Sequence, residues 1–181
     1  MSIKAERTIV TMTEWFEAEG IDEYYERLLD ILEQDMNFDD IQEVYFEQDM
    51  DQSEFKVKVI ATRHLGGHGI RGAGSDTDLV FVIDYFTQSP PRDSENGLFA
   101  AVEMDLEAKL EVSMPGNESW LHSVLRRIWF TNLFREQFRY WVELTQEEVK
   151  RFLNETRAFF GLEPVVRKPR RMKYEPLEYS I

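Results

Sequence analysis

The chain has 181 residues, of which 43% are hydrophobic and 13% aromatic, and it carries a formal net charge of −14 with no cysteine. This apolar content excludes a disordered chain, and the absence of cysteine excludes a disulfide framework, a thiol nucleophile and a thiolate metal site. No apolar segment approaches the roughly 20 residues that span a bilayer, and the N-terminus has no signal-peptide core. We therefore expect a folded protein without a membrane partner, located in the cytoplasm or in a particle such as a virion that assembles there.

The charge is distributed unevenly along the sequence. Met1–Glu54 contains seventeen acidic and three basic residues and so accounts for the whole net charge. Phe55–Ile181 contains eighteen of each, and its bases gather in Leu121–Lys173, with twelve against six acids. An acidic surface repels nucleic acids and attracts basic surfaces, including those of another copy of the chain. Direct nucleic-acid binding is therefore not expected.

The N-terminal third predicts two helices. Thr11 and Glu14 have the spacing of a capping box and Gly20 is a C-terminal stop, which predicts a short helix over Thr13–Glu19. Asp22 is the predicted N-cap of a second helix. The apolar residues of that helix recur at i, i+3, i+4 and i+7, namely Tyr25, Leu28, Leu29 and Leu32.

The middle of the chain predicts four β-strands. Gln42–Glu47 is a candidate strand, and a polar turn connects it to Glu54–Arg63, where apolar and polar residues alternate; this arrangement is typical of a hairpin. Thr77–Phe86 is apolar at nearly every position, which predicts a central strand. Val102–Met114 alternates strictly between apolar and polar residues, so one face of the sheet should be exposed to water.

Helical spacing returns after the strands. It predicts a helix over Leu121–Trp129, whereas residues 136–144 fit either a helix or a fifth strand, and both alternatives stay open. Thr145 and Glu148 have capping-box spacing and Gly161 supplies a stop, which predicts a last helix between them.

The chain end is predicted to be an extended arm. Prolines and a cluster of bases disfavour regular packing from residue 164 onward. The predicted organisation is an α+β domain over 1–163 followed by an arm over 164–181. The domain would hold a mainly antiparallel sheet of four or five strands, with acidic helices before it and aromatic-rich helices after it that cover one face.

A glycine-rich segment offers the strongest hint of catalysis. Leu65–Asp78 contains five of the nine glycines, followed by Asp-x-Asp at the start of a strand. This piece resembles nucleotidyltransferases of the polymerase-β type, although His68 stands where that family has a serine. The resemblance implies a magnesium-dependent enzyme with a phosphate-binding turn at Gly66 and Gly67 and with the catalytic carboxylates Asp76, Asp78 and Asp105. The other interpretation is a flexible loop that joins two antiparallel strands.

The acidic third supports a different alternative. Glu14–Glu54 holds sixteen carboxylates and one base, a density that can imitate a phosphate backbone, as in phage proteins that inhibit DNA-binding enzymes. The same acids could instead form solvated faces that keep the protein soluble.

The preferred hypothesis is a non-enzymatic assembly subunit, such as a virus or phage particle or tail component. Its acidic N-terminal region would contact the basic C-terminal arm of another copy, so its partners would be copies of itself or another protein. No cofactor or metal is expected. The predicted interaction residues are the bases and apolar side chains of the arm: Arg167, Lys168, Arg170, Arg171, Lys173, Tyr174, Leu177 and Tyr179.

Overall fold

The computed structural model describes residues 2–21, 23–49, 54–68, 75–88, 92–95, 97–115 and 134–165. Its elements follow the chain in this order: β1 Ser2–Ala18, α1 Tyr24–Asp30, the π-helical turn η1 Ile31–Asp35, β2 Asp40–Asp49, β3 Glu54–His68, β4 Ser75–Thr87, β5 Arg92–Ser94, β6 Gly97–Pro115 and α3 Phe134–Phe159.

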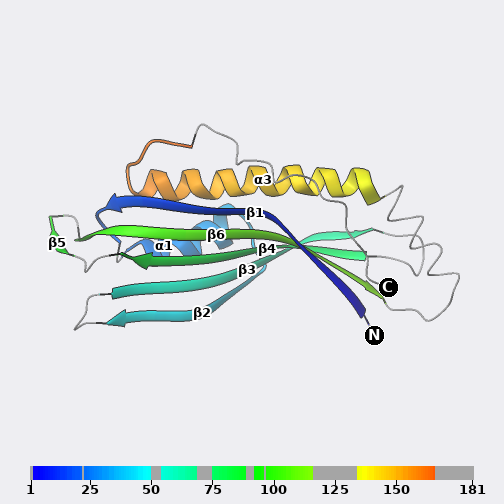
Figure 1. The fold of residues 1–181 in the computed structure, drawn as a ribbon, viewed down its shortest axis with the longest axis horizontal. Helices are drawn as coiled ribbons and strands as arrows, with labels where there is room; N and C mark the ends of the chain where they lie inside the picture. The colour runs from blue at the N-terminus through cyan, green and yellow to red at the C-terminus, as the bar shows by residue number, and fades with distance from the viewer. Residues whose placement is uncertain are drawn as a thin grey trace, which may run out of the picture.

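The strands form one antiparallel sheet in the order β1-β6-β4-β3-β2, and the short strand β5 pairs with β6. The two edge strands are β1 and β2, so the segment that contains α1 crosses from one edge of the sheet to the other (Figure 1). The predicted α+β class is confirmed. The sheet exceeds the four or five strands predicted, because it gains β1 and β5.

The first predicted helix is wrong, since Thr13–Glu19 falls almost entirely in β1. The capping-box signal is local, whereas β1 pairs with β6 over its whole length from Ser2 to Ala18. Its sequence is also rich in β-branched residues, which lose side-chain freedom in a helix and suit a strand. Long-range pairing therefore overrides the local helix signal.

The second predicted helix is confirmed as α1, which η1 prolongs to Asp35. Its N-cap residue is Glu23, which makes no side-chain capping bond, and Asp22 lies outside the described residues. The buried face is rotated from the predicted stripe and consists of Tyr24, Leu28, Ile31 and Leu32. Tyr25 instead donates its hydroxyl hydrogen bond to Glu43.

The four predicted strands are confirmed as β2, β3, β4 and β6. β4 lies between β3 and β6, as its continuous apolar sequence predicts. Alternation along β6 separates its faces as predicted: even-numbered residues from Val102 to Val112 are buried, and the intervening residues are partly exposed.

Residues 136–144, which were compatible with either structure, belong to the helix α3. Thr145 is therefore no N-cap: it is buried in the middle of α3 and its hydroxyl donates to the carbonyl of Trp141 at 2.7 Å. The predicted stop is confirmed. Gly161 has a φ of +66° and donates to Ala158, while Leu162 donates to Arg157, the two bonds of a Schellman motif. The helix predicted over Leu121–Trp129 lies outside the described residues.

Both helices pack on the same face of the sheet, which we call the inner face (Figure 1). α1 lies against β4 and β6, where the ring of Tyr24 packs at a tilt against that of Tyr85, with ring centroids 5.0 Å apart. α3 runs along β1, where Phe160 packs on Phe16 at 5.0 Å and Arg157 bonds Glu14 at 2.9 Å. The core fills the space between these layers.

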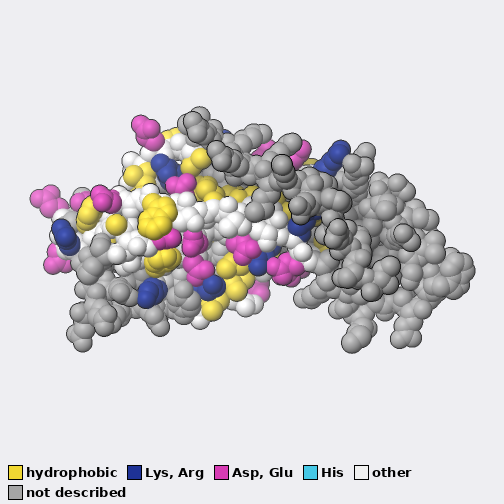
Figure 2. Space-filling view, in the orientation of Figure 1, with side chains coloured by type: hydrophobic (Ala, Val, Ile, Leu, Met, Phe, Trp, Pro, Cys, Tyr) yellow, Lys and Arg dark blue, Asp and Glu magenta, His cyan; other side chains and the backbone are white. Residues whose placement is uncertain are grey.

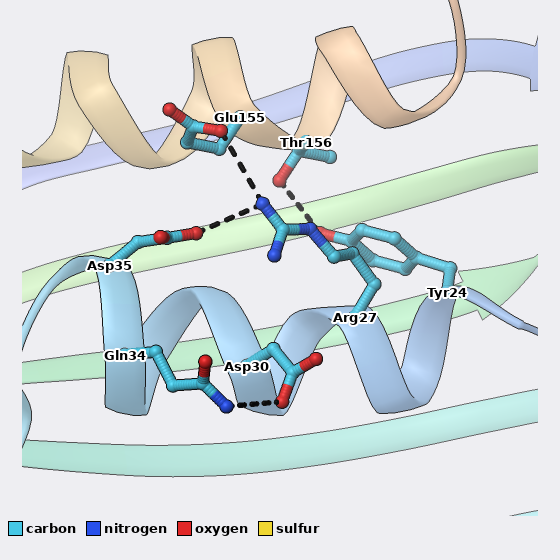
Figure 3. Close-up of polar contacts among 7 residues, drawn as sticks. All are labelled: Tyr24, Arg27, Asp30, Gln34, Asp35, Glu155 and Thr156. Carbon is cyan, nitrogen blue, oxygen red and sulfur yellow. Dashed lines mark hydrogen bonds and ion pairs between the residues drawn. The ribbon is translucent and has the colours of Figure 1, made fainter.

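Polar contacts also join the two helices to each other. Arg27 of α1 lies 2.9 Å from Asp35 and 3.5 Å from Glu155 of α3 (Figure 3). Beside it, the buried hydroxyls of Tyr24 and Thr156 are 2.7 Å apart. Burial raises the pKa of the Tyr24 phenol above its usual value, so this hydroxyl stays protonated. This cluster joins α1 to α3 and stabilises the layer that the two helices form.

Candidate functional site

The face of the sheet opposite the helices, which we call the outer face, is the main candidate site. The strand registers place the following described residues on it: Glu6, Thr8, Thr11, Thr13, Trp15 and Glu17 of β1; Glu103, Asp105, Glu107, Lys109, Glu111 and Ser113 of β6; Asp76, Asp78, Val80, Val82, Asp84 and Phe86 of β4; Lys56, Lys58, Ile60, Thr62 and His64 of β3; and Asp40 and Gln42 of β2.

The outer face is strongly acidic. Ten of the residues just named are Asp or Glu, against three lysines and one histidine. Figure 2 shows this side of the molecule, where acidic side chains (magenta) lie among hydrophobic ones (yellow). Most of these acids come from β4 and β6, outside the acidic N-terminal third of the sequence. Folding therefore builds an acidic surface that the sequence does not display as one segment.

The registers also place carboxylates directly opposite each other. Asp84 pairs with Asp105, and Glu111 pairs with both Asp78 on one side and Glu6 on the other. Directly opposed side chains on neighbouring strands have Cβ atoms about 4.5–5.5 Å apart, and like charges in such positions destabilise a sheet. The outer face therefore concentrates negative charge at an energetic cost to the folded chain.

Nearby bases offset only part of this charge. Lys58 lies 2.8 Å from Asp84, and Lys109 lies 2.8 Å from Glu6 and 3.3 Å from Glu107. The hydrogen bond to Glu6 is the main reason why the pKa of Lys109 is raised. Three lysines and ten carboxylates leave a surface that would attract a cationic partner.

Among the described residues of the outer face, His64 is the histidine, the side-chain type whose charge changes near neutral pH. Its Nδ1 lies 2.8 Å from Asp78, and this hydrogen bond is the largest cause of its raised pKa, to which the charges of Asp78, Asp76 and Asp39 add. Lowering the pH would therefore add positive charge at the end of the outer face where Asp78 and Glu111 lie.

An aromatic side chain lies at the opposite end of the face. Trp15 is 61% exposed and is paired with Glu103, whose other neighbour is Phe86. Desolvation, followed by the charge of Asp105, raises the pKa of Glu103. An exposed tryptophan beside a carboxylate can contact both the apolar and the cationic part of a partner.

The structure separates the carboxylates that resemble a nucleotidyltransferase site. Asp76 and Asp78 share the outer face, but the residue opposite Asp78 on β6 is Glu111, and Asp105 lies opposite Asp84 instead. Glu111 follows Asp105 by six positions along β6, a distance of roughly 20 Å. Among the described residues, no set of three His, Asp or Glu side chains could hold one metal ion.

Gly66 and Gly67, the glycines on which that resemblance depends, are paired residues of β3. Gly66 pairs with Thr77 after an irregularity in β3 and has a φ of +111°, and Gly67 pairs with Asp76. The conformation of Gly66 suits only glycine, because L side chains rarely adopt it. In the described structure Gly66 lets β3 continue past the irregularity. Residues 69–74 of the glycine-rich segment lie outside the described part.

The predicted interaction residues Arg167 to Tyr179 lie outside the described residues, which end at Val165. The preceding segment turns back along α3. The side chain of Arg157 donates to the carbonyl of Glu163 at 2.5 Å, and the amide of Val165 donates to Asn154 at 2.8 Å. The last described residue, Val165, therefore lies at the helical layer, on the side of the sheet opposite the outer face.

No known protein family matches the sequence, and no curated protein resembles it at a significant level. None of the helices that the structure describes is long and apolar enough to cross a membrane.

Proposed function

We propose that this protein is a non-enzymatic interaction subunit that binds a basic partner protein through the outer face of its sheet. The observation that supports this proposal is the alignment of opposed carboxylates, Asp84 with Asp105 and Asp78 with Glu111, on a face that neither α1 nor α3 covers.

A basic partner relieves the repulsion that these pairs create. When a cationic side chain approaches two neighbouring carboxylates, it gains attraction to both and removes part of their mutual repulsion. The carboxylates of this face therefore repel one another less when a cationic partner is bound than when the face is exposed to solvent. Exposed Trp15 at one end supplies an apolar contact of the kind that contributes strongly to interfaces.

The broader role that we propose is a subunit of an assembled particle, such as a virion or a phage tail, formed in the cytoplasm. The support is that one chain carries both an acidic surface and a cluster of five bases in Arg167–Lys173. Complementary charges on a single chain allow copies to bind one another.

The alternative of a DNA mimic is less well supported. The acids of Glu14–Glu54 are divided between two layers: Glu17 and Asp40 lie on the outer face, whereas Glu26 and Glu33 are exposed on the helical layer. Glu14 is already bonded to Arg157. A phosphate-like series would need these carboxylates on one continuous surface.

Binding of a fluorescent octa-arginine peptide would test the proposal. At low ionic strength the double variant Asp105→Asn/Glu111→Gln should bind the peptide roughly tenfold more weakly than the natural chain. The matched control, Glu26→Gln/Glu33→Gln, removes the same charge from the helical layer and should reduce affinity less than about twofold. Equal losses in the two variants would mean that the peptide senses only net charge, and the proposal would be wrong.

A further inference from the structure

We infer that the partner of the outer face is the basic segment Arg167–Lys173 of a second copy of this chain. This inference rests on the proposed function, because it names the occupant of the same face. It concerns a contact between unlike surfaces, the sheet of one copy and the C-terminal segment of the next.

Edge-to-edge pairing is a poor route to self-association here. The edge strand β1 has an irregular register between Thr8 and Val10, and the edge strand β2 has one between Glu43 and Tyr45. Bulges of this kind interrupt the ladder and twist the edge, which discourages pairing with a strand of another molecule. Within the described sheet, the outer face is therefore the surface that can take part in a contact between copies.

Two outer faces cannot pack on each other. Each carries ten acidic residues against three lysines, so a symmetric face-to-face dimer would bring like charges together. A contact between copies must therefore join this face to a basic surface. That requirement makes the contact heterologous, which produces rings or open stacks instead of two-fold dimers.

The segment Arg167–Lys173 is the best complement within the chain. It has five bases and no acid in seven residues, whereas the bases of α3 alternate with glutamates along the helix. Several described arginines are already paired, among them Arg27, Arg63 and Arg157. The basic segment would lie against the opposed carboxylates of β4 and β6. The apolar residues that follow it, Tyr174, Leu177 and Tyr179, would contact the exposed Trp15 end.

The position of Val165, shortly before the basic segment, favours binding of the segment to a second copy over binding to its own outer face. Val165 is bonded to Asn154 of α3, so the chain leaves the described structure along the helical layer. The sixteen residues that follow reach at most roughly 58 Å when extended. To reach its own outer face the segment would have to pass around the β1 edge, whereas the outer face of a second copy can meet the segment without that detour.

A charge-swap experiment in the full chain tests the inference. The face variant Asp105→Lys/Glu111→Lys and the segment variant Arg170→Glu/Arg171→Glu should each lose the assemblies that light scattering detects for the natural chain at about 50 mM salt. Mixed in equal amounts, they should form a heterodimer, because one supplies an intact segment and the other an intact face. The four substitutions combined in one chain should restore assembly.

Two controls keep the outcome interpretable. Lys150→Glu/Arg151→Glu makes the same charge change on α3 and should leave assembly intact. If Asp105→Lys/Glu111→Lys does not fold by circular dichroism, then Asp105→Asn/Glu111→Gln replaces it, with weakened assembly as the expected result.

The outcomes separate this inference from the proposed function. A natural chain that stays monomeric but binds octa-arginine through its outer face would overturn the second-copy inference and leave the proposed function standing. Loss of assembly in both single variants without heterodimer formation on mixing would mean that the segment does not bind the face of another copy. A chain that neither assembles nor binds octa-arginine would overturn both.

Discussion

The two faces of the sheet use the same five long strands in opposite ways. On the inner face, within the part of the chain that the structure describes, Arg63 lies 3.0 Å from Glu148 of α3, and these side chains are 14% and 13% exposed. On the outer face carboxylates stand opposite carboxylates. Alternation along each strand allows this division, since neighbouring residues point to opposite sides. The inner face therefore maintains the fold, and neither of the described helices α1 and α3 covers the outer face.

The largest predicted effect tests the inner face. Arg63 also donates to the carbonyl of Met36 at 2.6 Å and lies over the ring of Phe38. Arg63→Ala would leave the largely buried Glu148 carboxylate without its cation, which should lower the free energy of unfolding by about 3–5 kcal/mol. Urea denaturation measures this change.

The comparison variant for that test is Lys58→Ala, which breaks an outer-face ion pair on the same strand. Lys58 and Asp84 are 30% and 25% exposed, so we expect a loss of about 1 kcal/mol or less. If the two variants lost equal stability, the contrast between the faces would be wrong. Arg63→Met/Glu148→Leu should recover most of the loss, because it removes both buried charges.

A smaller effect is expected at the contact between the helices. Tyr24→Phe removes the phenol that bonds the hydroxyl of Thr156 at 2.7 Å in the core. Leaving one buried hydroxyl without this partner should lower the free energy of unfolding by about 1–2 kcal/mol. Tyr140→Phe, at a position that is 58% exposed on α3, serves as the control and should change stability little. Thermal unfolding of both variants compares them, and similar melting temperatures would contradict the prediction.

On the outer face, removing a charged group should stabilise the protein instead of destabilising it. Asp105→Asn removes one of two directly opposed charges and keeps an oxygen that can accept the hydrogen bond from Thr13. The free energy of unfolding should rise by about 0.2–1 kcal/mol. Glu33→Gln, which neutralises an exposed acid on η1, should have a smaller effect. Urea denaturation at low salt distinguishes the two, and a loss of stability in Asp105→Asn would show that the opposed pair is not repulsive.

The smallest effect concerns pH. The folded chain raises the pKa of His64 above its unfolded value, because Asp78 accepts its hydrogen bond. This contact should stabilise the fold fully below the ordinary histidine pKa of about 6.5, and the stabilisation should be lost as the pH rises through the raised value. The effect is small because the His64 side chain is 53% exposed.

The pH dependence is measured by urea denaturation of His64→Gln and the natural chain at acidic and alkaline pH. The variant should be less stable than the natural chain under acidic conditions and equally stable under alkaline ones. Asp78→Asn should remove the same pH dependence. A difference that grows with rising pH would contradict the assigned sign.

The sequence predicted much of the fold because several signals are local and strong. Continuous apolar residues placed β4 in the centre of the sheet, and alternation identified the water-facing side of β6. Gly161 marked the end of α3 because its positive φ suits glycine. The failures have a common cause. Thr11 with Glu14, and Thr145 with Glu148, have capping-box spacing in a strand and in the middle of a helix, since spacing alone does not report long-range pairing.

The candidate site was predicted only in part. The polar positions of β6 indicated an exposed face, but the sequence assigned the acidic surface to the first third of the chain. No local pattern could show that Asp84 would lie opposite Asp105. The nucleotidyltransferase resemblance grouped Asp105 with Asp78 for the same reason, since adjacent strands were assumed and their register was unknown.

The sequence by itself determined the periodicity of the strands, the position of α1 and the end of α3, because these depend on residues within one or two turns of each other. The tertiary structure alone decided the register of the sheet, which joins groups as distant as Thr8 and Glu107, whose side chains bond at 2.8 Å although 99 positions separate them. A register shift of one residue would move every carboxylate of a strand to the other face. The acidic outer face therefore exists only because the whole sheet fixes that register.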